Sequence, residues 1–274
     1  MPELPEVETV RRGLAQWCIG SSIQEVHVLH PRATNLRSIA PLEEITGATI
    51  ERISRRGKFL WFELDRAYFL VAHLGMSGQF RIHSTGAPDE KHLRIRLVLN
   101  DHQELRFVDQ RTFGWLALST REGTAPEMVT GIAPDIFDPL FDRPGVVKKF
   151  RMKRTEIKRA LLDQHLMSGV GNIYADESLS RSKIHPQSRT DELSPQKIER
   201  VLTATEAVMS KALVEGGTSF DSLYINVNGE SGYFEHSLEA YGREHEPCSR
   251  CATQIRRIVI GARSSHFCPR CQRL

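Results

Sequence analysis

The chain has 274 residues, of which 40% are hydrophobic and 26% charged, and its formal net charge is only +3. This composition excludes a disordered or low-complexity protein and predicts two or three domains with buried cores. No apolar run approaches the roughly 20 residues of a membrane-spanning helix, and the acidic N-terminus lacks the apolar segment of a signal peptide. We therefore expect a cytoplasmic protein without a membrane partner, whose cysteines stay reduced.

The first residues, Met1-Pro2-Glu3-Leu4-Pro5, contain a possible nucleophile. If Met1 is removed, Pro2 carries a free secondary amine, and because an α-amino group titrates near ~8, a usable fraction is neutral at physiological pH. Attack of such an amine on an aldehyde-level carbon gives an iminium ion, and the carboxylate of Glu3 lies beside it for proton transfer. The alternative is an ordinary disordered terminus.

The next segment predicts a helix followed by a β-rich region. Pro5 and the acidic residues after it are typical of a first helical turn. The helix is expected to end near Gly20 and to bury one face, formed by Val7, Val10, Leu14 and Trp17. Strand patterns at 58–64, 68–73 and 93–99 then indicate that about 20–120 is a β-sandwich or barrel.

Four side chains in the β-rich region are candidates for chemistry or DNA contact. Lys58 follows Arg55-Arg56-Gly57 at the start of a strand, although a lysine there is usually solvated. Met76 and Phe113 lie at predicted loop tips, with Arg111 beside Phe113. Bulky groups of this kind can fill the gap left by a base extruded from a duplex. The alternative places Met76 and Phe113 in the core.

The second half of the chain predicts helices. Residues 126–144 are rich in Pro, Asp and Gly and are expected to link two domains. Helices are expected at 157–164 and from Pro195 to Leu213. The turn Gly169-Val170-Gly171-Asn172 precedes a further helix and resembles a phosphate-binding N-terminus, with an ordinary interhelical turn as the alternative. The polar segment 226–232 predicts a mobile loop.

Positive charge is concentrated in two segments. Between Lys148 and Asp163 seven basic residues accompany two acidic ones, and between Tyr241 and Leu274 seven arginines accompany two glutamates. Charge gathered in this way favours a polyanionic partner such as nucleic acid, although two solvated faces would give the same counts.

Four cysteines have the spacing of a zinc site. The pairs Cys248/Cys251 and Cys268/Cys271 are each CxxC and are separated by sixteen residues, which predicts one tetrahedral, structural zinc ion with no position left for water. The segment between them should form a hairpin whose tip, near 261–265, presents Arg263 to phosphate. Cys18 is predicted to be a small core residue.

Taken in order, these motifs resemble the bacterial formamidopyrimidine-DNA glycosylases. The motifs that carry the resemblance are Met1-Pro2-Glu3-Leu4-Pro5-Glu6-Val7-Glu8-Thr9, Arg55-Arg56-Gly57-Lys58, His73-Leu74-Gly75-Met76-Ser77-Gly78, Asp109-Gln110-Arg111-Thr112-Phe113-Gly114, Leu161-Leu162-Asp163-Gln164, Gly169-Val170-Gly171-Asn172-Ile173-Tyr174-Ala175-Asp176-Glu177, Tyr241-Gly242-Arg243 and the cysteine quartet. The resemblance covers essentially the whole chain. It implies an α+β fold: an N-terminal β-sandwich with the first helix (1–130), a helix–two-turns–helix domain (131–235) with a lesion-capping loop (218–233), and a zinc-finger hairpin (236–274).

The resemblance also implies a function and a set of site residues. The function is base-excision repair of oxidised purines in double-stranded DNA, by a monomeric bifunctional glycosylase and lyase with one structural Zn²⁺. Expected catalytic residues are Pro2, Glu3, Lys58 and Arg263, supported by Glu6. Expected DNA contacts are His73, Met76, His92, Arg111, Phe113, Lys153, Asn172 and Arg263, and the metal ligands are Cys248, Cys251, Cys268 and Cys271.

Two rival functions are open at this point. The same scaffold could act on oxidised pyrimidines, although Leu4 is typical of the formamidopyrimidine branch. A non-catalytic DNA-binding zinc protein is the other rival, and the joint presence of Pro2, Glu3 and Lys58 argues against it.

Overall fold

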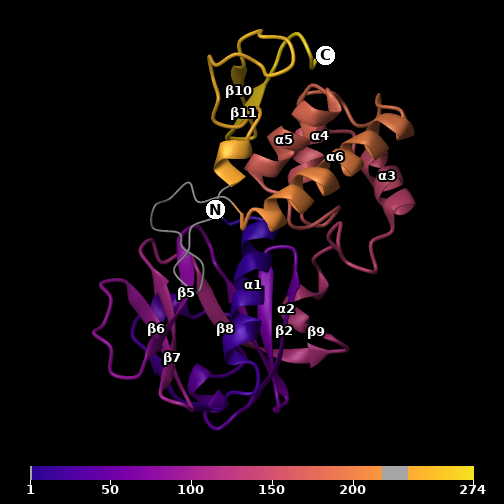
Figure 1. Cartoon of the computed structure of the whole chain (residues 1–274). Helices are drawn as coiled ribbons and strands as arrows, with labels where there is room; N and C mark the ends of the chain where they lie inside the picture. Colours follow the sequence, from indigo (N-terminus) through magenta and orange to yellow (C-terminus); the bar gives the residue numbers. More distant parts are fainter. Residues whose placement is uncertain (1, 218–233) are drawn as a thin grey trace. The chain divides into compact units, whose positions relative to one another are not determined.

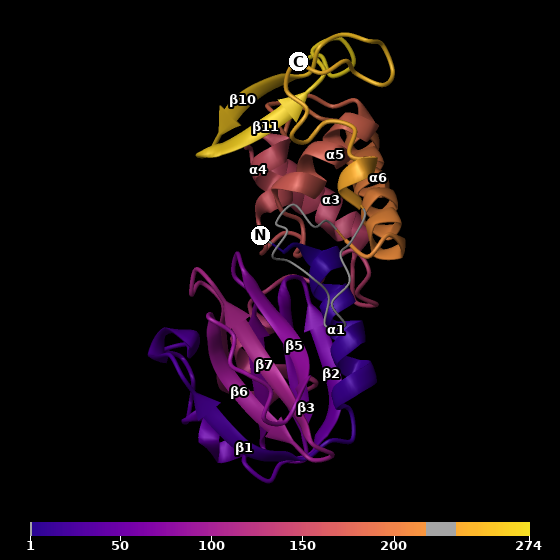
Figure 2. The same ribbon diagram turned by 60° about the vertical axis from the view of Figure 1, so that its left-hand side comes forward.

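The computed structural model describes residues 2–217 and 234–274. The chain divides into two compact units (Figures 1 and 2). Among the described residues, the first unit comprises 2–131 with 216–217, and the second comprises 132–215 with 234–274.

The first unit begins with helix α1 (Leu4–Cys18) and continues as two antiparallel sheets. One sheet has the order β1-β6-β7-β5 and the other β2-β3-β4-β8-β9. The strands are β1 (Ile23–Val28), β2 (Ile50–Arg56), β3 (Phe59–Leu64), β4 (Tyr68–His73), β5 (Gly78–Ser84), β6 (Leu93–Leu99), β7 (Gln103–Asp109), β8 (Trp115–Glu122) and β9 (Ala125–Pro126). Short helical turns occur at η1 (Pro31–Ala33), η2 (Leu42–Ile45) and α2 (Glu127–Thr130).

The two sheets pack their apolar faces together and α1 packs against them. Phe62 of one sheet meets Phe80 of the other edge-on, with ring centroids 5.8 Å apart. Strand β6 alternates buried and half-buried residues, as a strand with one face on a core must. The hydrophobic core also takes in Val7 and Leu14 of α1, which are fully buried. This arrangement confirms the predicted β-sandwich with an N-terminal helix.

The second unit is helical and ends in a hairpin. Its helices are α3 (Arg143–Met152), α4 (Ile157–Leu162), α5 (Asn172–Ser182) and α6 (Pro195–Val214), followed by the turn η3 (Phe234–Ser237). The hairpin consists of β10 (Arg256–Ile260) and β11 (Arg263–Phe267). Every residue of α5 except Asn172 and Arg181 is buried, so this helix forms the centre of the unit.

Several local predictions were wrong in detail. Trp17 was placed on the buried face of α1, but its side chain is 44% exposed, and the buried face continues from Leu14 to Cys18 instead. The hairpin tip is narrower than 261–265: Ile260 pairs with Arg263, and only Gly261 and Ala262 form the turn, both with positive φ. Cys18, as predicted, is a buried core residue, and burial raises the pKa of its thiol to about 12.

Candidate active site and nucleic-acid interface

The first residues of the chain are fixed by the cap of α1. The side chain of Glu3, the N-cap, accepts from the backbone N–H of Glu6, and Glu6 Oε2 accepts in return from Glu3 N at 2.8 Å. This reciprocal capping box satisfies two backbone donors that the helix itself leaves unpaired. Pro2 is buried, and Glu3 and Glu6 are each only 2% exposed. The terminus is therefore an ordered structure at the end of a helix, and the alternative of a disordered terminus is wrong for residues 2 and 3.

Lys58 lies in the tight turn between β2 and β3 and is only 8% exposed. The interpretation of Lys58 as a solvated lysine is therefore wrong. A chain of contacts joins its turn to α1: Glu8 Oε2 accepts from Arg55 Nε at 3.2 Å, and Arg55 Nη1 donates to the carbonyl of Gly57 at 3.2 Å. Burial opposes ionisation of Glu8, but hydrogen bonds and charge from Arg11 and Arg55 outweigh it and lower the pKa of Glu8 to about 2. An ionised Glu8 thus ties the Lys58 turn to the helix that begins beside Pro2.

Gly217 lies against Glu6. A Cβ added at Gly217 would be 3.1 Å from Glu6 Cγ and from Oε1, and the residue has φ +84°, a conformation that favours glycine. No sequence pattern pointed to this contact, because the two residues are far apart in the chain. The side chain of Glu6, whose carboxylate completes the capping box, therefore has to shift before a side chain fits at Gly217.

Two loops carry the predicted wedge residues, and one buried carboxylate joins them. Asp109 is fully buried and accepts from Ser77 Oγ at 2.5 Å and from Gly114 N at 2.7 Å. It also accepts from Arg111 N at 3.1 Å. A Cβ on Gly75 would be 2.4 Å from the backbone of Phe113, so the two loops touch through their backbones.

The side chains at the tips of these loops are exposed. Met76 is 45% and Phe113 60% exposed, which rules out the alternative that they belong to the core. Arg111 Nη1 lies 4.0 Å from the sulfur of Met76. Two bulky apolar groups and one guanidinium are thus presented to solvent on a rigid base, which is the arrangement that insertion into a base stack requires.

The two predicted histidines differ in how they are held. His73 Nδ1 accepts from Gly75 N at 3.1 Å, and the ring stacks on Trp115 with centroids 5.8 Å apart. Burial, helped by the charge of Lys58, lowers the pKa of His73 to about 4, so the ring is neutral at pH 7. The carbonyl of His92 accepts from the backbone N–H of Asp109 at 2.9 Å, so His92 is held by the backbone of the residue whose carboxylate joins the wedge loops.

In the second unit, the glycine turn before α5 is closed by Gln164. Its Nε2 donates to the carbonyl of Val170 at 3.0 Å, and its Oε1 accepts from Gly169 N at 2.9 Å. Asn172, predicted to precede the helix, is in fact its first residue, with Gly171 as the N-cap. Its Nδ2 donates to the carbonyl of Ser264 at 3.0 Å. The contact places Asn172 one residue from Arg263, although 91 positions separate the two in the sequence.

Beneath this contact lies a buried ion pair that the sequence did not indicate. Lys158 Nζ donates to Asp176 Oδ1 at 2.6 Å and to the carbonyl of Ser264 at 2.7 Å, and both charged side chains are fully buried. Asp176 also accepts from Ser265 Oγ and from His266 N, each at 2.8 Å. The ion pair therefore fixes three consecutive residues of β11, and Arg263 is the next residue along that strand.

The four cysteines form a metal centre. Their sulfur atoms all lie within 4.8 Å of one another, and Cys251 Sγ is 3.5 Å from Cys268 Sγ and 3.4 Å from Cys271 Sγ. Four thiolates at ~2.3 Å from one tetrahedral zinc would be about 3.8 Å apart, so the donor set fits the ion. The four cysteines bind one structural zinc. Gln272, directly after Cys271, donates from Nε2 to the carbonyl of Ile184 at 2.9 Å, which joins the metal centre to the segment that follows α5.

The remaining predictions on the second unit have simpler outcomes. Lys153 Nζ forms an exposed ion pair with Asp163 at 2.8 Å. The predicted lesion-capping loop, 218–233, lies outside the described residues. Within residues 2–217 and 234–274, no helix has the length and apolar character that crossing a membrane requires.

Comparison with known proteins assigns all three regions of the chain. Residues 1–116 match the formamidopyrimidine-DNA glycosylase N-terminal domain, 132–222 match the formamidopyrimidine-DNA glycosylase H2TH domain, and 246–274 match the zinc finger found in FPG and IleRS.

Whole proteins match over their full length. The formamidopyrimidine-DNA glycosylase of Rhodococcus jostii is 54% identical over 280 residues, covering 99% of this chain and 96% of the relative, and that of Thermobifida fusca is 50% identical. Among solved structures, a mutant of the Lactococcus lactis protein in complex with a Fapy-dG containing DNA has a TM-score of 0.92 at 36% identity, with both chains covered completely. A complex of the Lactococcus lactis protein with abasic-site DNA has a TM-score of 0.90. Taken with the Pro2-Glu3 segment at the cap of α1 and the cysteine quartet, these matches show that the chain belongs to the formamidopyrimidine-DNA glycosylase family.

Proposed function

We propose that this protein removes oxidised purines, 8-oxoguanine and formamidopyrimidines, from double-stranded DNA and then cleaves the strand at the abasic site. The observation that carries the proposal is the ordered Pro2-Glu3 terminus at the cap of α1 in a chain of this family. The relatives are named as glycosylases of this class, and solved neighbours hold abasic-site and Fapy-dG DNA. The resemblance to the formamidopyrimidine branch favours purines over oxidised pyrimidines.

The reaction begins at the terminal amine. With Met1 removed, the nitrogen of Pro2 attacks C1′ of the damaged nucleoside, a C1′–N bond forms, and the bond from C1′ to the base breaks. Glu3 is the partner that moves protons during base departure and sugar opening. The cap contact from Glu6 and the Glu8–Arg55 chain hold both participants and the Lys58 turn in place. Lys58, buried beside His73, supplies positive charge near the lesion.

Strand cleavage follows from the electron demand of the iminium ion. The iminium at C1′ acidifies the proton on C2′, and its loss expels the 3′-phosphate in a β-elimination. A second elimination expels the 5′-phosphate, and Arg263 assists this step. Hydrolysis then returns the amine of Pro2. The zinc ion takes no part, because four thiolates fill its coordination sphere.

DNA is held by both units in this proposal. Met76 and Phe113 fill the gap left by the flipped nucleotide, and Arg111 faces the orphaned base, whose acceptors its guanidinium can bind. Flipping costs a few kcal/mol, which the wedge and the phosphate contacts offset. Asn172 and Arg263 bind phosphates, and His73, His92 and Lys153 contact the backbone. The loop 218–233 closes over the damaged base.

Three broader features complete the proposal. The protein acts as a cytoplasmic monomer. Its functional division is 1–130, 131–235 and 236–274, which the separate family matches at 1–116, 132–222 and 246–274 support. The rival function, a non-catalytic DNA-binding zinc protein, has no observation in its favour beyond the zinc site itself.

The test is borohydride trapping of the mature protein on a duplex with 8-oxoguanine opposite cytosine. We expect a covalent adduct whose peptide map places the bond on Pro2. Lys58→Ala is compared with Lys211→Ala, which changes a surface lysine and serves as the control. Both variants should still form the adduct on Pro2, and Lys58→Ala should form it more slowly. An adduct on Lys58, or active enzyme that retains Met1 by intact mass, would contradict the terminal-amine mechanism. Tight binding without any adduct would support the non-catalytic rival.

A further inference from the structure

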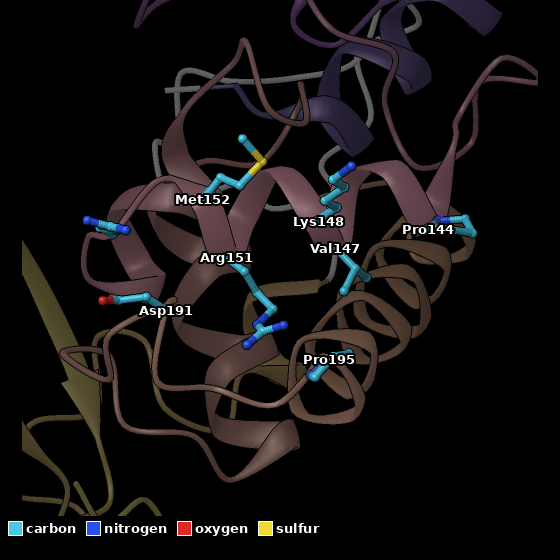
Figure 3. A pocket seen from close by; sticks show the side chains of 8 residues that line it. Pro144, Val147, Lys148, Arg151, Met152, Asp191 and Pro195 are labelled. Atoms are coloured by element: carbon cyan, nitrogen blue, oxygen red, sulfur yellow. The ribbon is translucent and has the colours of Figure 1, made fainter.

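A hollow of about 410 Å³ on the helical unit is not used by the proposed reaction (Figure 3). We call it the α3 pocket. It lies between α3, the turn that follows α3, and the start of α6, and its lining residues are Pro144, Val147, Lys148, Arg151, Met152, Arg154, Asp191 and Pro195. None of these is a predicted catalytic, DNA-binding or zinc-binding residue. A hollow of this size is within the range of small-molecule and side-chain binding sites.

The walls of the pocket are largely hydrocarbon. In Figure 3, Val147 and Arg151 project from α3 towards Pro195 at the start of α6. Met152, at the end of α3, is 69% exposed, which is a large fraction for an unbranched apolar side chain. The stem of Arg151 adds further methylene groups. A concave, mostly apolar surface with a few charged groups at its edge is typical of a binding site.

The rim of the pocket is strongly positive. Three cations, Lys148, Arg151 and Arg154, are among its eight lining residues. Within the described part of the chain, no carboxylate lies within ion-pair distance of Lys148 or Arg151. Asp191 is the one acidic residue in the lining, and it already accepts from Arg189 Nη2 at 3.2 Å. The pocket thus combines an apolar floor with unneutralised positive charge.

We infer that the α3 pocket binds an acidic peptide segment of a partner protein that carries one large apolar side chain. The apolar side chain enters the hollow between Val147 and Met152, and its acidic neighbours meet Lys148, Arg151 and Arg154. Recognition of acidic motifs by clustered arginines is a common mode of peptide binding. A DNA backbone would satisfy the cations but has no apolar group to fill the hollow, and charge complementarity therefore favours the peptide.

The inference is tested by fluorescence polarisation with a labelled peptide of aspartate and glutamate residues around one phenylalanine. We expect saturable binding to the full-length zinc-loaded protein, weakened about tenfold, or 1.4 kcal/mol, when serine replaces the phenylalanine. Met152→Ser should weaken binding of the phenylalanine peptide to a similar degree and leave base excision unchanged. Leu140→Ser removes a side chain of similar exposure (71%) in the same unit and serves as the matched control.

Four results would overturn the inference. Equal affinity for the two peptides would mean that charge alone attracts them, and equal loss in Met152→Ser and Leu140→Ser would place binding elsewhere. If undamaged duplex DNA displaces the peptide, and Met152→Ser also lowers the affinity for DNA, the pocket is part of a nucleic-acid surface. Concentration-dependent dimerisation abolished by Met152→Ser would identify a second copy of the chain as the occupant. Arg151→Ala separates the contributions, since it should weaken both peptides by the same factor.

Discussion

Asp176 and Lys158 form a fully buried ion pair at 2.6 Å, and the same two side chains hold the strand that carries Arg263. The pair therefore links the centre of the helical unit to the proposed phosphate ligands. Burying two charges is costly, and breaking such a pair by removing one partner is typically destabilising by about 3–5 kcal/mol. A pair placed here is expected to affect function through the position of β11.

Substitution of Asp176→Asn tests this role. We expect the free energy of unfolding to fall by about 3–5 kcal/mol and the second elimination to slow relative to the first, because Arg263 loses its fixed position. The measurement is urea unfolding together with the ratio of the two cleavage products on a gel. Glu206→Gln breaks an exposed pair with Arg143 in the same unit and should cost no more than about 1 kcal/mol. An unchanged product ratio in Asp176→Asn would assign the pair to stability alone.

Gly217→Ala should impair the N-terminal site more than its backbone strain explains. A Cβ at Gly217 would lie 3.1 Å from the side chain of Glu6, whereas a Cβ at Gly20 would have no atom within 4 Å. The backbone conformations are alike, with φ +84° at Gly217 and +87° at Gly20. Gly20→Ala is therefore the matched control and should cost only the left-handed penalty of about 1–2 kcal/mol. We expect slower borohydride trapping in Gly217→Ala alone. Equal trapping rates would show that Glu6 tolerates displacement.

Ser77→Ala should loosen the two wedge loops. The hydroxyl of Ser77 donates to Asp109 and accepts from Arg111 N, so its removal leaves part of a buried carboxylate unsatisfied, at about 1–3 kcal/mol. We expect a lower rate of excision from duplex DNA and a smaller change on single-stranded substrate, where no stack has to be filled. Ser84→Ala, at the exposed far end of β5, the strand that begins directly after Ser77, is the control. Equal losses on both substrates would separate these loops from base flipping.

His73 should make stability depend on pH. Its pKa is lowered to about 4 in the fold, against about 6.5 in the unfolded chain. Between these values the unfolded chain binds more protons, so stability is fully present above pH 6.5 and falls as the pH approaches 4. The His73→Gln variant lacks this pH-dependent contribution. The difference between the unfolding free energies of the wild type and His73→Gln should therefore become smaller as the pH falls. A constant gap for His73→Gln would refute the shift.

Zinc removal should unfold the hairpin and weaken DNA binding. Cys268→Ser is expected to lose the metal, measured as zinc per chain, and to expose the amides of β10 and β11 to hydrogen exchange, because so small a hairpin depends on its metal. Cys18→Ser changes a cysteine of equal burial outside the site and should keep one zinc per chain. Retained protection of the hairpin in Cys268→Ser would contradict this dependence.

A feature could be predicted from the sequence when the residues that form it lie close together in the chain. The zinc ligands lie in two short motifs with a known spacing, so their geometry was predictable. The strands and the capped helix were recognisable from local periodicity. The burial of Lys58 was not predictable, because its turn contacts α1 through Arg55 and Glu8, which are 47 positions apart.

The Asp176 network was invisible for the same reason. Asp176 lies in a helix buried on nearly all sides, where no polar face marks a functional position, and its partners on β11 are about 90 residues away. Trp17 shows the opposite failure: it fits the helical period, but the buried face of α1 runs from Leu14 to Cys18 and Trp17 is half-exposed beside it. Periodicity identifies a face, and only the folded neighbours decide where its burial ends.

The capping box at the start of α1 has a consequence for how mutants of this site are interpreted. Glu3 and Glu6 each complete the other's backbone hydrogen bond, so the residues proposed for chemistry also nucleate the helix. An alanine at either position would fray the terminus and remove a carboxylate at once, and lost activity could not be divided between the two effects. Glutamine retains an acceptor oxygen without the charge. Only the amide variants can therefore distinguish a proton carrier from a helix cap.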